Sequence, residues 1–389
     1  MDQGVVEYEC YTIMIIRNIK LKNFRNYENL DFVLNNRLNI IIGNNAQGKT
    51  NILESIYFLS LTKSFFAVND KVVIKKNCLY ARIDGIITSN NGCNNLSILV
   101  NSCGKYLKIG NKEIKKSSDY LGYLKVILFS PDNIRLLKEG PSIRRRFLNI
   151  EISQLSKRYI LILNQFNDLL KQRNEYLKNI RNSLVDKDYM LILNQKFAEL
   201  AYQIYNFRND FIVEINKRIK DIYKSIINID NIEIKYITDI KLNDKETMIN
   251  EIIDRLDRNY DKEILYGSTL IGPQRDDFCI LLNGNDISSY GSQGQMRIAI
   301  LSVKLSEIDI IFNKFGEYPV ILLDDIFSEL DVDKRNKLIK YLNCDKQVII
   351  TTTDIENINE ELVNNAKLFK IDNGKVIETR EGMRDINEQ

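Results

Sequence analysis

Eight residues near the N-terminus constrain this 389-residue chain more than any other feature. Gly43 to Thr50 read Gly-Asn-Asn-Ala-Gln-Gly-Lys-Thr, which fits the spacing G-x-x-x-x-G-K-[ST]. The apolar run Leu38 to Ile42 precedes the motif. Ile52, Ile56 and Leu59 follow it at helical spacing, which predicts an amphipathic helix. A buried strand, a glycine-rich turn and a helix in this order predict a phosphate-binding loop. The glycines let successive backbone N–H groups surround phosphate oxygens, and the helix N-terminus adds a positive dipole.

This motif, a Walker A sequence, predicts a site for ATP and Mg²⁺. We expect Lys49 to reach the β- and γ-phosphates and the Thr50 hydroxyl to ligate Mg²⁺. The cofactor-binding residues expected in the loop are Gly43, Asn44, Asn45, Ala46, Gln47, Gly48, Lys49 and Thr50.

A second motif lies far along the chain, where the apolar run Val320 to Leu323 ends in Asp324 and Asp325. A buried strand that ends in carboxylates is typical of a Walker B motif. We expect Asp324 to be the second Mg²⁺ ligand, and Asp325 to orient or deprotonate the attacking water. The alternative is a pair of aspartates that cap a helix. The long interval after Thr50 fits an ATPase head interrupted by a lobe.

Ser292-Gln293-Gly294-Gln295 opens a long helical pattern shortly before the Walker B motif. These residues resemble an ABC signature motif, in which the Ser292 hydroxyl, the Gly294 backbone N–H and Gln295 would contact a γ-phosphate. The alternative is a simple capping box. A signature in this fold acts on the partner subunit, so the prediction includes an ATP-dependent homodimer with shared sites and a catalytic role for Ser292, Lys49 and Asp325.

Two short segments after the Walker B motif extend the predicted site. Ser328-Glu329-Leu330-Asp331 is similar to a D-loop, which makes Asp331 a candidate at the shared nucleotide. Thr351-Thr352-Thr353-Asp354 follows the next apolar strand. Thr353 is the candidate there for contact with the γ-phosphate or its water, and a threonine that merely satisfies a strand end is the alternative.

Charge and composition exclude several classes of protein. The chain has no histidine, which excludes any mechanism that needs a histidine base or metal ligand. No apolar run is long enough for a membrane span, and six dispersed cysteines predict reduced thiols in a cytoplasmic protein. Residues 14–150 hold 22 Lys and Arg against 9 Asp and Glu, whereas residues 263–389 hold 14 against 22. The basic third indicates an anionic partner such as nucleic acid, unless acidic and basic segments fold together and cancel.

Hydrophobic patterning predicts an α/β fold in which an ABC-type P-loop ATPase head carries an antiparallel β subdomain and an inserted α-helical lobe. Alternating strands are expected around Ile15 to Leu34 and over 71–114, and two long helices forming an antiparallel hairpin over about 143–225, with a break at Asn182-Ser183. The predicted divisions are an N-terminal extension over 1–13, the first part of the head over 14–140, the lobe over 141–262 and the second part of the head over 263–389.

From Met14 to near the C-terminus the sequence resembles the RecF family, which is related to SMC-type heads. Beyond the motifs above, the resemblance rests on Leu21-Lys22-Asn23-Phe24-Arg25-Asn26-Tyr27, Phe129-Ser130-Pro131-Asp132, Gly140-Pro141-Ser142, Arg144-Arg145-Arg146-Phe147-Leu148 and Gly272-Pro273-Gln274-Arg275-Asp276-Asp277. It implies a weak DNA-stimulated ATPase that binds double-stranded and gapped DNA. It also implies recombinational repair, replication-fork recovery and the SOS response, with RecR and RecO as partners in loading recombinase, on the nucleoid.

The sequence departs from this family in three places. Residues 1–13 precede the usual start, Thr62 to Phe66 lacks an expected basic residue after Ser64, and Gln274 stands where the family usually has histidine. The run Arg144, Arg145 and Arg146 is a candidate DNA contact, with a solvated helix face or internal ion pairs as the alternative. Two other functions stay open: an ABC transporter ATPase subunit, and a nucleotide-gated structural clamp that does not hydrolyse ATP.

Overall fold

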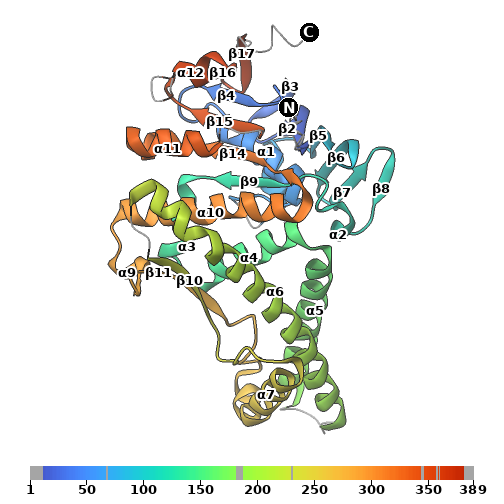
Figure 1. Cartoon of the computed structure of the whole chain (residues 1–389). Helices are drawn as coiled ribbons and strands as arrows, with labels where there is room; N and C mark the ends of the chain where they lie inside the picture. Colours follow the sequence, from blue (N-terminus) through green and yellow to red (C-terminus); the bar gives the residue numbers. More distant parts are fainter. Residues whose placement is uncertain are drawn as a thin grey trace, which may run out of the picture. The chain divides into compact units, whose positions relative to one another are not determined.

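The computed structural model describes residues 12–66, 69–180, 187–228, 231–342, 346–355, 358 and 360–380. The chain forms two compact units (Figure 1). The first, called the head below, comprises Met1–Asn133, Ser225–Ile227 and Lys304–Gln389, and the second, the lobe, comprises Ile134–Lys224 and Asn228–Val303. Of the predicted extension 1–13, the described part is the strand β1 (Thr12–Ile13), which pairs in parallel with β13 (Glu317–Tyr318). Among the described residues, no helix combines the length and apolarity needed to cross a membrane.

A mostly parallel six-stranded sheet in the head has the strand order β17-β16-β4-β15-β14-β9. Its strands are β4 (Leu38–Ile42), β9 (Val126–Phe129), β14 (Val320–Asp324), β15 (Val348–Thr352), β16 (Lys367–Asp372) and the antiparallel edge strand β17 (Lys375–Arg380). β9, β14 and β15 are buried along their whole length, as expected for strands covered on both faces. Because β4, β15 and β14 are parallel neighbours, their carboxyl ends meet at one edge.

A second six-stranded sheet in the head is antiparallel throughout, in the order β3-β2-β5-β6-β7-β8. It consists of β2 (Ile15–Phe24), β3 (Tyr27–Val33), β5 (Tyr80–Ser89), β6 (Gly92–Asn101), β7 (Gly104–Ile109) and β8 (Lys112–Ile114). Its strands show the alternation of buried and exposed residues that a half-buried sheet requires. The antiparallel subdomain predicted from sequence is therefore confirmed.

Helix α1 (Lys49–Leu61) lies between the two sheets of the head and contacts strands of both. The sequence predicted an amphipathic helix, but eleven of its thirteen residues are buried, including the polar Glu54 and Ser55. A helix covered on two sides by sheets has no solvent face, so the amphipathic expectation is wrong for this helix. The head also contains the helices α2 (Ser117–Tyr120), α11 (Val332–Leu342) and α12 (Glu360–Asn364), and the second part of α10 (Gln293–Phe315).

Three long helices dominate the lobe: α4 (Pro141–Leu155), α5 (Lys157–Asn179) and α6 (Lys187–Ile227). Ring contacts of Tyr159 with Phe207 and Phe166 with Phe197 run in opposite directions along α5 and α6, which confirms the predicted antiparallel hairpin (Figure 1). The predicted first helix is in fact two, because Ser156 is extended and caps α5 by accepting a bond from the Tyr159 N–H. The predicted break at Asn182-Ser183 lies outside the described residues.

The lobe also contains a small sheet, β10 (Ile232–Ile237), β11 (Asp277–Leu282) and β12 (Asn285–Asp286). Its helices are α3 (Arg135–Lys138), α7 (Lys245–Arg258), α8 (Tyr260–Tyr266), α9 (Ile287–Tyr290) and the first part of α10 (Gln293–Phe315). The sequence placed the end of the lobe at 262, whereas this unit continues to Val303. Pairing of β10 with β11, from Ile232 opposite Leu282, ties the later segment to the lobe.

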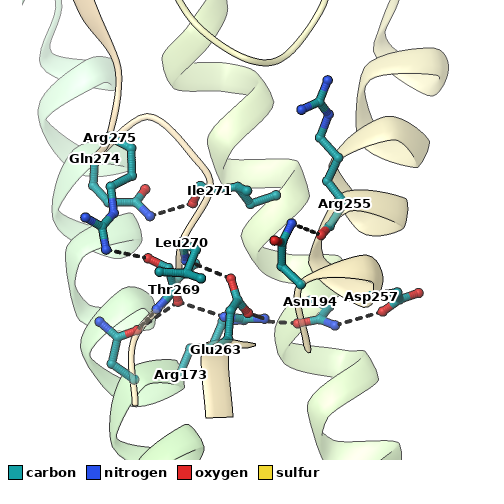
Figure 2. A network of polar contacts seen from close by, with 12 residues as sticks. Arg173, Asn194, Arg255, Asp257, Glu263, Thr269, Leu270, Ile271, Gln274 and Arg275 are labelled. Carbon is teal, nitrogen blue, oxygen red and sulfur yellow. Dashed lines mark hydrogen bonds and ion pairs between the residues drawn. The ribbon is translucent and has the colours of Figure 1, made fainter. Parts of the chain in front are cut away.

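A fully buried ion pair joins three parts of the lobe (Figure 2). Arg173 of α5 pairs with Glu263 of α8 at 2.7 Å, and also donates to the Asn194 side chain of α6 and to the Thr269 hydroxyl. The second Glu263 oxygen accepts from the Leu270 N–H at 2.8 Å. Both partners of the pair are thus satisfied, as buried charges must be.

Candidate functional site

The loop between β4 and α1 has the backbone conformation that a phosphate-binding turn needs. Ala46 and Gly48 adopt left-handed conformations, with φ of 65° and 108°. Alternation of right- and left-handed residues turns successive N–H groups toward one point. Gly48 has a second constraint, because a Cβ there would lie 2.4 Å from Nδ2 of Asn26 and 2.9 Å from the Tyr27 hydroxyl. Only glycine satisfies both conditions.

Lys49 lies over this loop and is almost completely buried. Its Nζ donates to the carbonyls of Gly43 and Asn44, at 2.5 and 2.9 Å. Burial lowers the pKa of this ammonium group, and the attraction of Asp325 and Asp324 opposes that change. The charge is therefore held in a poorly hydrated position beside the turn, where an anionic ligand is its natural partner.

The Walker B residues lie beside the start of α1, as the sequence predicted. Oδ1 of Asp324, at the end of β14, accepts hydrogen bonds from the Thr50 hydroxyl at 2.9 Å and the Thr351 hydroxyl at 2.8 Å. Burial raises the pKa of Asp324, and these two hydroxyl bonds counteract the rise. Sequence reasoning missed Thr351, whose only signal was a buried polar residue at the end of an otherwise apolar strand.

Asp325 has two unusual features. It is a non-glycine residue with a φ of 50°, and one of its carboxylate oxygens is buried without a hydrogen-bond partner among the described residues. Its N–H is held by the carbonyl and the hydroxyl of Thr351, at 3.2 and 3.1 Å. Backbone strain and an unsatisfied buried acceptor are both costly, and both are concentrated at functional sites.

The Mg²⁺ predicted from sequence has a suitable place here. Thr50 and Asp324 present a hydroxyl and a carboxylate oxygen to one point, and oxygen ligands of this kind suit Mg²⁺. Among the described residues, no cluster of three or more acidic, histidine or cysteine side chains forms a closed metal cage. Two protein oxygens fit an ion that completes its coordination with phosphates and water.

A turn that entered the sequence analysis only through the family resemblance supports the P-loop from outside. Asn26, between β2 and β3, donates to the Gln47 carbonyl and accepts from the Asn51 side chain. Tyr27 donates its hydroxyl to the Gly48 carbonyl at 3.0 Å. The Gln47 side chain in turn accepts from the Asn373 N–H at 2.5 Å. Three hydrogen bonds thus hold the loop in place before any ligand binds, and no local sequence signal predicted these contacts.

A partly buried charge pair adjoins this turn. Arg25, with a φ of 54°, makes two short hydrogen bonds to Glu54 in α1, at 2.6 and 2.7 Å. The Ser64 hydroxyl donates to the same carboxylate at 2.6 Å. The segment Thr62 to Phe66, whose role the sequence left in doubt, is thereby anchored to α1.

The predicted signature residues open α10 on an exposed surface of the lobe. Ser292 and Gln295 form a reciprocal capping box, in which the Gln295 N–H donates to Oγ of Ser292 at 3.2 Å and the Ser292 N–H donates to Oε1 of Gln295 at 2.9 Å. Gly294 is exposed, and its Cβ position would meet no atom closer than 4.0 Å. The capping-box alternative thus describes the local geometry, and contact with a partner's nucleotide stays a prediction.

The other predicted site residues have local roles within the chain. Asp331 caps α11 by accepting from the Lys334 N–H at 3.0 Å, and the hydrogen bond from Lys334 lowers its pKa. Thr353 is exposed just beyond β15. Contacts of these two residues with nucleotide stay predictions.

The three candidate DNA-binding arginines differ from one another. Arg144 makes a two-pronged ion pair with Asp277, at 2.6 and 2.8 Å, and donates to two backbone carbonyls. Arg145 donates to the carbonyl of Asp276 at 2.7 Å. Arg146 also has an interaction within the chain. A DNA contact at these residues stays a prediction, with Arg144 already engaged in a structural pair.

Comparisons with known proteins agree with this geometry. The family model described as the RecF/RecN/SMC N terminal domain matches residues 15–376. The chain is 39% identical over 370 residues to the DNA replication and repair protein RecF of Staphylococcus haemolyticus (strain JCSC1435), covering 94% of this chain and all of that protein. The corresponding protein of Staphylococcus epidermidis (strain ATCC 35984 / RP62A) is 38% identical with the same coverage.

Solved structures place the fold in the same class. The structure described as the recombination mediator protein RecF-ATP in the RecFOR pathway superposes with a TM-score of 0.90 at 32% identity, covering 96% of this chain and all of that one. An SMC head bound to the C-terminal winged-helix domain of ScpA matches at a TM-score of 0.54 and 13% identity, and shares the fold alone.

Fold and site together define a P-loop protein of the ABC type, with an SMC-like head, an antiparallel β subdomain and a helical lobe. More specifically, the chain belongs to the RecF family of DNA replication and repair proteins.

Proposed function

We propose that this protein is an ATP-gated DNA-binding protein of recombinational repair and replication-fork recovery. Binding of ATP drives homodimerisation and clamping on double-stranded and gapped DNA, and slow hydrolysis to ADP and phosphate drives release. The observation that carries the proposal is the cluster beside the P-loop. Buried Lys49 lies there with Thr50 and Asp324, whose oxygens are 2.9 Å apart, and with the unsatisfied carboxylate of Asp325.

Each residue of this cluster has a distinct proposed role. Lys49 exchanges its two carbonyl partners for phosphate oxygens, and the backbone N–H groups of Gly43 to Gly48 surround the same phosphates. Thr50 and Asp324 hold Mg²⁺, which supplies charge neutralisation at the β- and γ-phosphates. Asp325 orients the attacking water with the oxygen that has no partner among the described residues.

The second half of the proposed site comes from another copy of the chain. Ser292, Gly294 and Gln295 at the start of α10, with Asp331, contribute to the partner's nucleotide. The exposed N-terminus of a long helix supports this role, because its first N–H groups have no partners within the helix. Thr353, just beyond β15, contacts the γ-phosphate or its water. RecR and RecO type proteins are the proposed partners in loading recombinase on gapped DNA. This proposal rests on the RecFOR context of the solved relative, and the proposed place of action is the nucleoid.

The first test is ATP binding by Lys49→Met. Loss of a charge-assisted contact to phosphate is worth about 1.5–3 kcal/mol, or roughly 10- to 100-fold in affinity. Isothermal titration calorimetry measures the change, and Lys112→Met, at an exposed position of β8, is the matched control. Unchanged ATP affinity in Lys49→Met means that the P-loop assignment is wrong.

The second test separates binding from turnover. Asp325→Asn is expected to keep ATP binding, to lower hydrolysis by about 10²- to 10⁴-fold and to accumulate an ATP-dependent dimer. Asp333→Asn, at an exposed position in α11, is the control. If Asp325→Asn hydrolyses ATP at the wild-type rate, the role assigned to Asp325 is wrong. A wild-type protein without measurable turnover, with or without DNA, would instead support the non-hydrolysing clamp.

The third test concerns the dimer. Ser292→Arg is expected to abolish the ATP-dependent rise in mass seen by light scattering while leaving ATP affinity unchanged. Ser102→Arg, between β6 and β7, introduces the same side chain at another exposed serine. A Ser292→Arg protein that still dimerises with ATP would refute the shared-site mechanism.

A further inference from the structure

The lobe contains a pocket that the proposed ATPase cycle does not use. Its volume is about 500 Å³, and its walls come from the first turn of α4, from α5 and from the segment 268–275. All of these residues belong to the lobe unit. A cavity of this size matches small phosphorylated ligands, since ligand sites are typically some 300–1,000 Å³.

Two guanidinium groups line this pocket, those of Arg145 and Arg275. Each donates to one backbone carbonyl, Arg145 to Asp276 at 2.7 Å and Arg275 to Thr269 at 3.3 Å. Among the described residues, neither arginine forms an ion pair with a carboxylate. A guanidinium has five N–H donors, so most of the donors in this pair are left for a ligand.

The nearest carboxylates are bonded to residues other than these two arginines. Asp277 is paired with Arg144, and Asp276 accepts a hydrogen bond from the Tyr236 hydroxyl at 2.7 Å. Burial lowers the pKa of Arg145. Repulsion from Arg208 and Arg275 adds to this effect, and attraction by Asp277 and Asp276 opposes it. The two arginines therefore lie close together without a carboxylate bonded directly to either of them among the described residues.

Further hydrogen-bond donors line the same pocket. Ser142 and Ser268 contribute hydroxyl groups, and Asn174 contributes its side-chain amide. Oδ1 of Asn174 accepts two bonds from Thr269, at 2.7 and 2.8 Å, which orients the amide so that its NH₂ group is the end left to donate.

The wall of the pocket is rigid, because Thr269 belongs to the buried network of Arg173 and Glu263. Figure 2 shows Arg275 and Gln274 on the same segment as Thr269, next to that network. A donor set fixed before binding loses less entropy when a ligand arrives.

We propose that this pocket is a phosphate-binding site of the lobe, with Arg145 and Arg275 as its charged ligands. Guanidinium forks match phosphate oxygens in pairs, and hydroxyl and amide donors complete the coordination of a tetrahedral oxyanion. The phosphate belongs either to nucleic acid or to a free nucleotide or inorganic phosphate. The nucleic-acid source rests on the DNA binding proposed above, whereas the phosphate site itself does not.

The experiment uses the full chain in two forms. Inorganic phosphate is titrated into the chain carrying Lys49→Met, in which the P-loop contributes little to anion binding, and binding is followed by calorimetry. Gapped DNA is titrated with ATP present into the chain with an intact P-loop, over a salt series, and binding is followed by fluorescence anisotropy. The variant Arg145→Gln/Arg275→Gln is expected to lose phosphate binding at least tenfold, because each charged contact is worth about 1.5–3 kcal/mol. If DNA supplies the phosphate, the salt slope of DNA binding falls by about 2.

Two further variants keep the test decisive. Ser268→Asp leaves both arginines in place but adds a carboxylate to the pocket, and is expected to abolish phosphate binding as well. Arg158→Gln removes an equal charge from an exposed position of α5 outside the pocket, and is expected to change phosphate binding less than twofold.

Each outcome decides the proposal. Loss of phosphate binding with unchanged DNA binding assigns the site to free nucleotide or phosphate, and loss of both assigns it to nucleic acid. Three results would overturn the proposal. Arg158→Gln could weaken phosphate binding as much as the pocket variants do, or the pocket variants could leave phosphate binding unchanged. The third is poly-glutamate competing for the site as strongly as phosphate. If the unchanged pocket binds phosphate but the chain with an intact P-loop does not bind DNA, the proposed function alone is contradicted.

Discussion

Replacing Glu263 by glutamine tests whether the buried ion pair organises the lobe. The side chains of Arg173 and Glu263 are both fully buried, and their charged atoms are 2.7 Å apart. Glutamine keeps the shape but removes the charge, so Arg173 becomes a buried cation without a counter-ion. Glutamine also offers one acceptor where the carboxylate offers two, so either Arg173 or the Leu270 N–H faces an NH₂ group. Breaking one side of such a pair costs about 3–5 kcal/mol.

The size of this loss depends on the partner, which makes a double-mutant cycle informative. Arg173→Met alone leaves the Glu263 carboxylate buried and unpaired, and is expected to cost a similar amount. The double variant Arg173→Met/Glu263→Met leaves no buried charge, and is expected to lose less than the sum of the single changes by at least about 2 kcal/mol.

The assay must report on the lobe, because the chain contains two compact units and need not unfold in one step. Hydrogen exchange of the amides in α5 and α6, measured by mass spectrometry, gives the local free energy of opening. Arg158→Gln, on the exposed face of α5, is the matched control. A Glu263→Gln lobe within about 1 kcal/mol of the wild type, or single changes that simply add, would refute the assigned role of the pair.

Two other changes have outcomes that follow from the structure. Gly48→Ala is expected to lower ATP affinity at least tenfold by calorimetry, because its Cβ would lie 2.4 Å from Asn26. Gly110→Ala, at a φ of 58° with no atom within 4 Å, is expected to cost only about 1 kcal/mol of stability. Burial raises the pKa of Asp276 to about 6, so the fold favours its protonated form. Its contribution to stability is therefore complete below about pH 4 and disappears as the pH rises through 6, a loss of about 2–3 kcal/mol. Asp276→Asn should remove that part of the pH dependence of the free energy of unfolding, measured in urea. A free energy of unfolding that changes with pH as in the wild type would contradict the raised pKa of Asp276.

Local patterns were sufficient to predict the parts of the site that lie on single segments. The strand Leu38 to Ile42, the loop that follows and the strand before Asp324 were all predicted from spacing and apolar runs, because each is a local signal. Side chains from distant segments could not be predicted in this way. Asn26 reaches the P-loop from 21 residues away, and Arg173 reaches Glu263 from 90 residues away. Such partners become neighbours only through strand pairing and helix packing.

The errors have the same physical origin. The first lobe helix was predicted to be continuous, because nothing in the apolar spacing marks Ser156 as an extended residue. Helix α1 was expected to have a solvent face, because its sequence does not reveal that two sheets cover it. The lobe unit continues beyond the predicted boundary at 262, because the pairing of β10 with β11 joins segments some 45 residues apart, beyond the range of a local pattern.

The charge pattern shows how the structure changes an argument made from sequence. The basic N-terminal third and the acidic C-terminal third were the first indication of an anionic partner, yet most of both belongs to the head unit. Their opposite charges therefore share one compact body, as the cancelling alternative required. The proposed phosphate site is indicated instead by the contacts of individual arginines. Arg144 has a carboxylate partner and Arg145 has none among the described residues, although the two are adjacent in sequence. Counting charges along a chain cannot make that distinction, because desolvation and pairing, not number, decide which cation is left for a ligand.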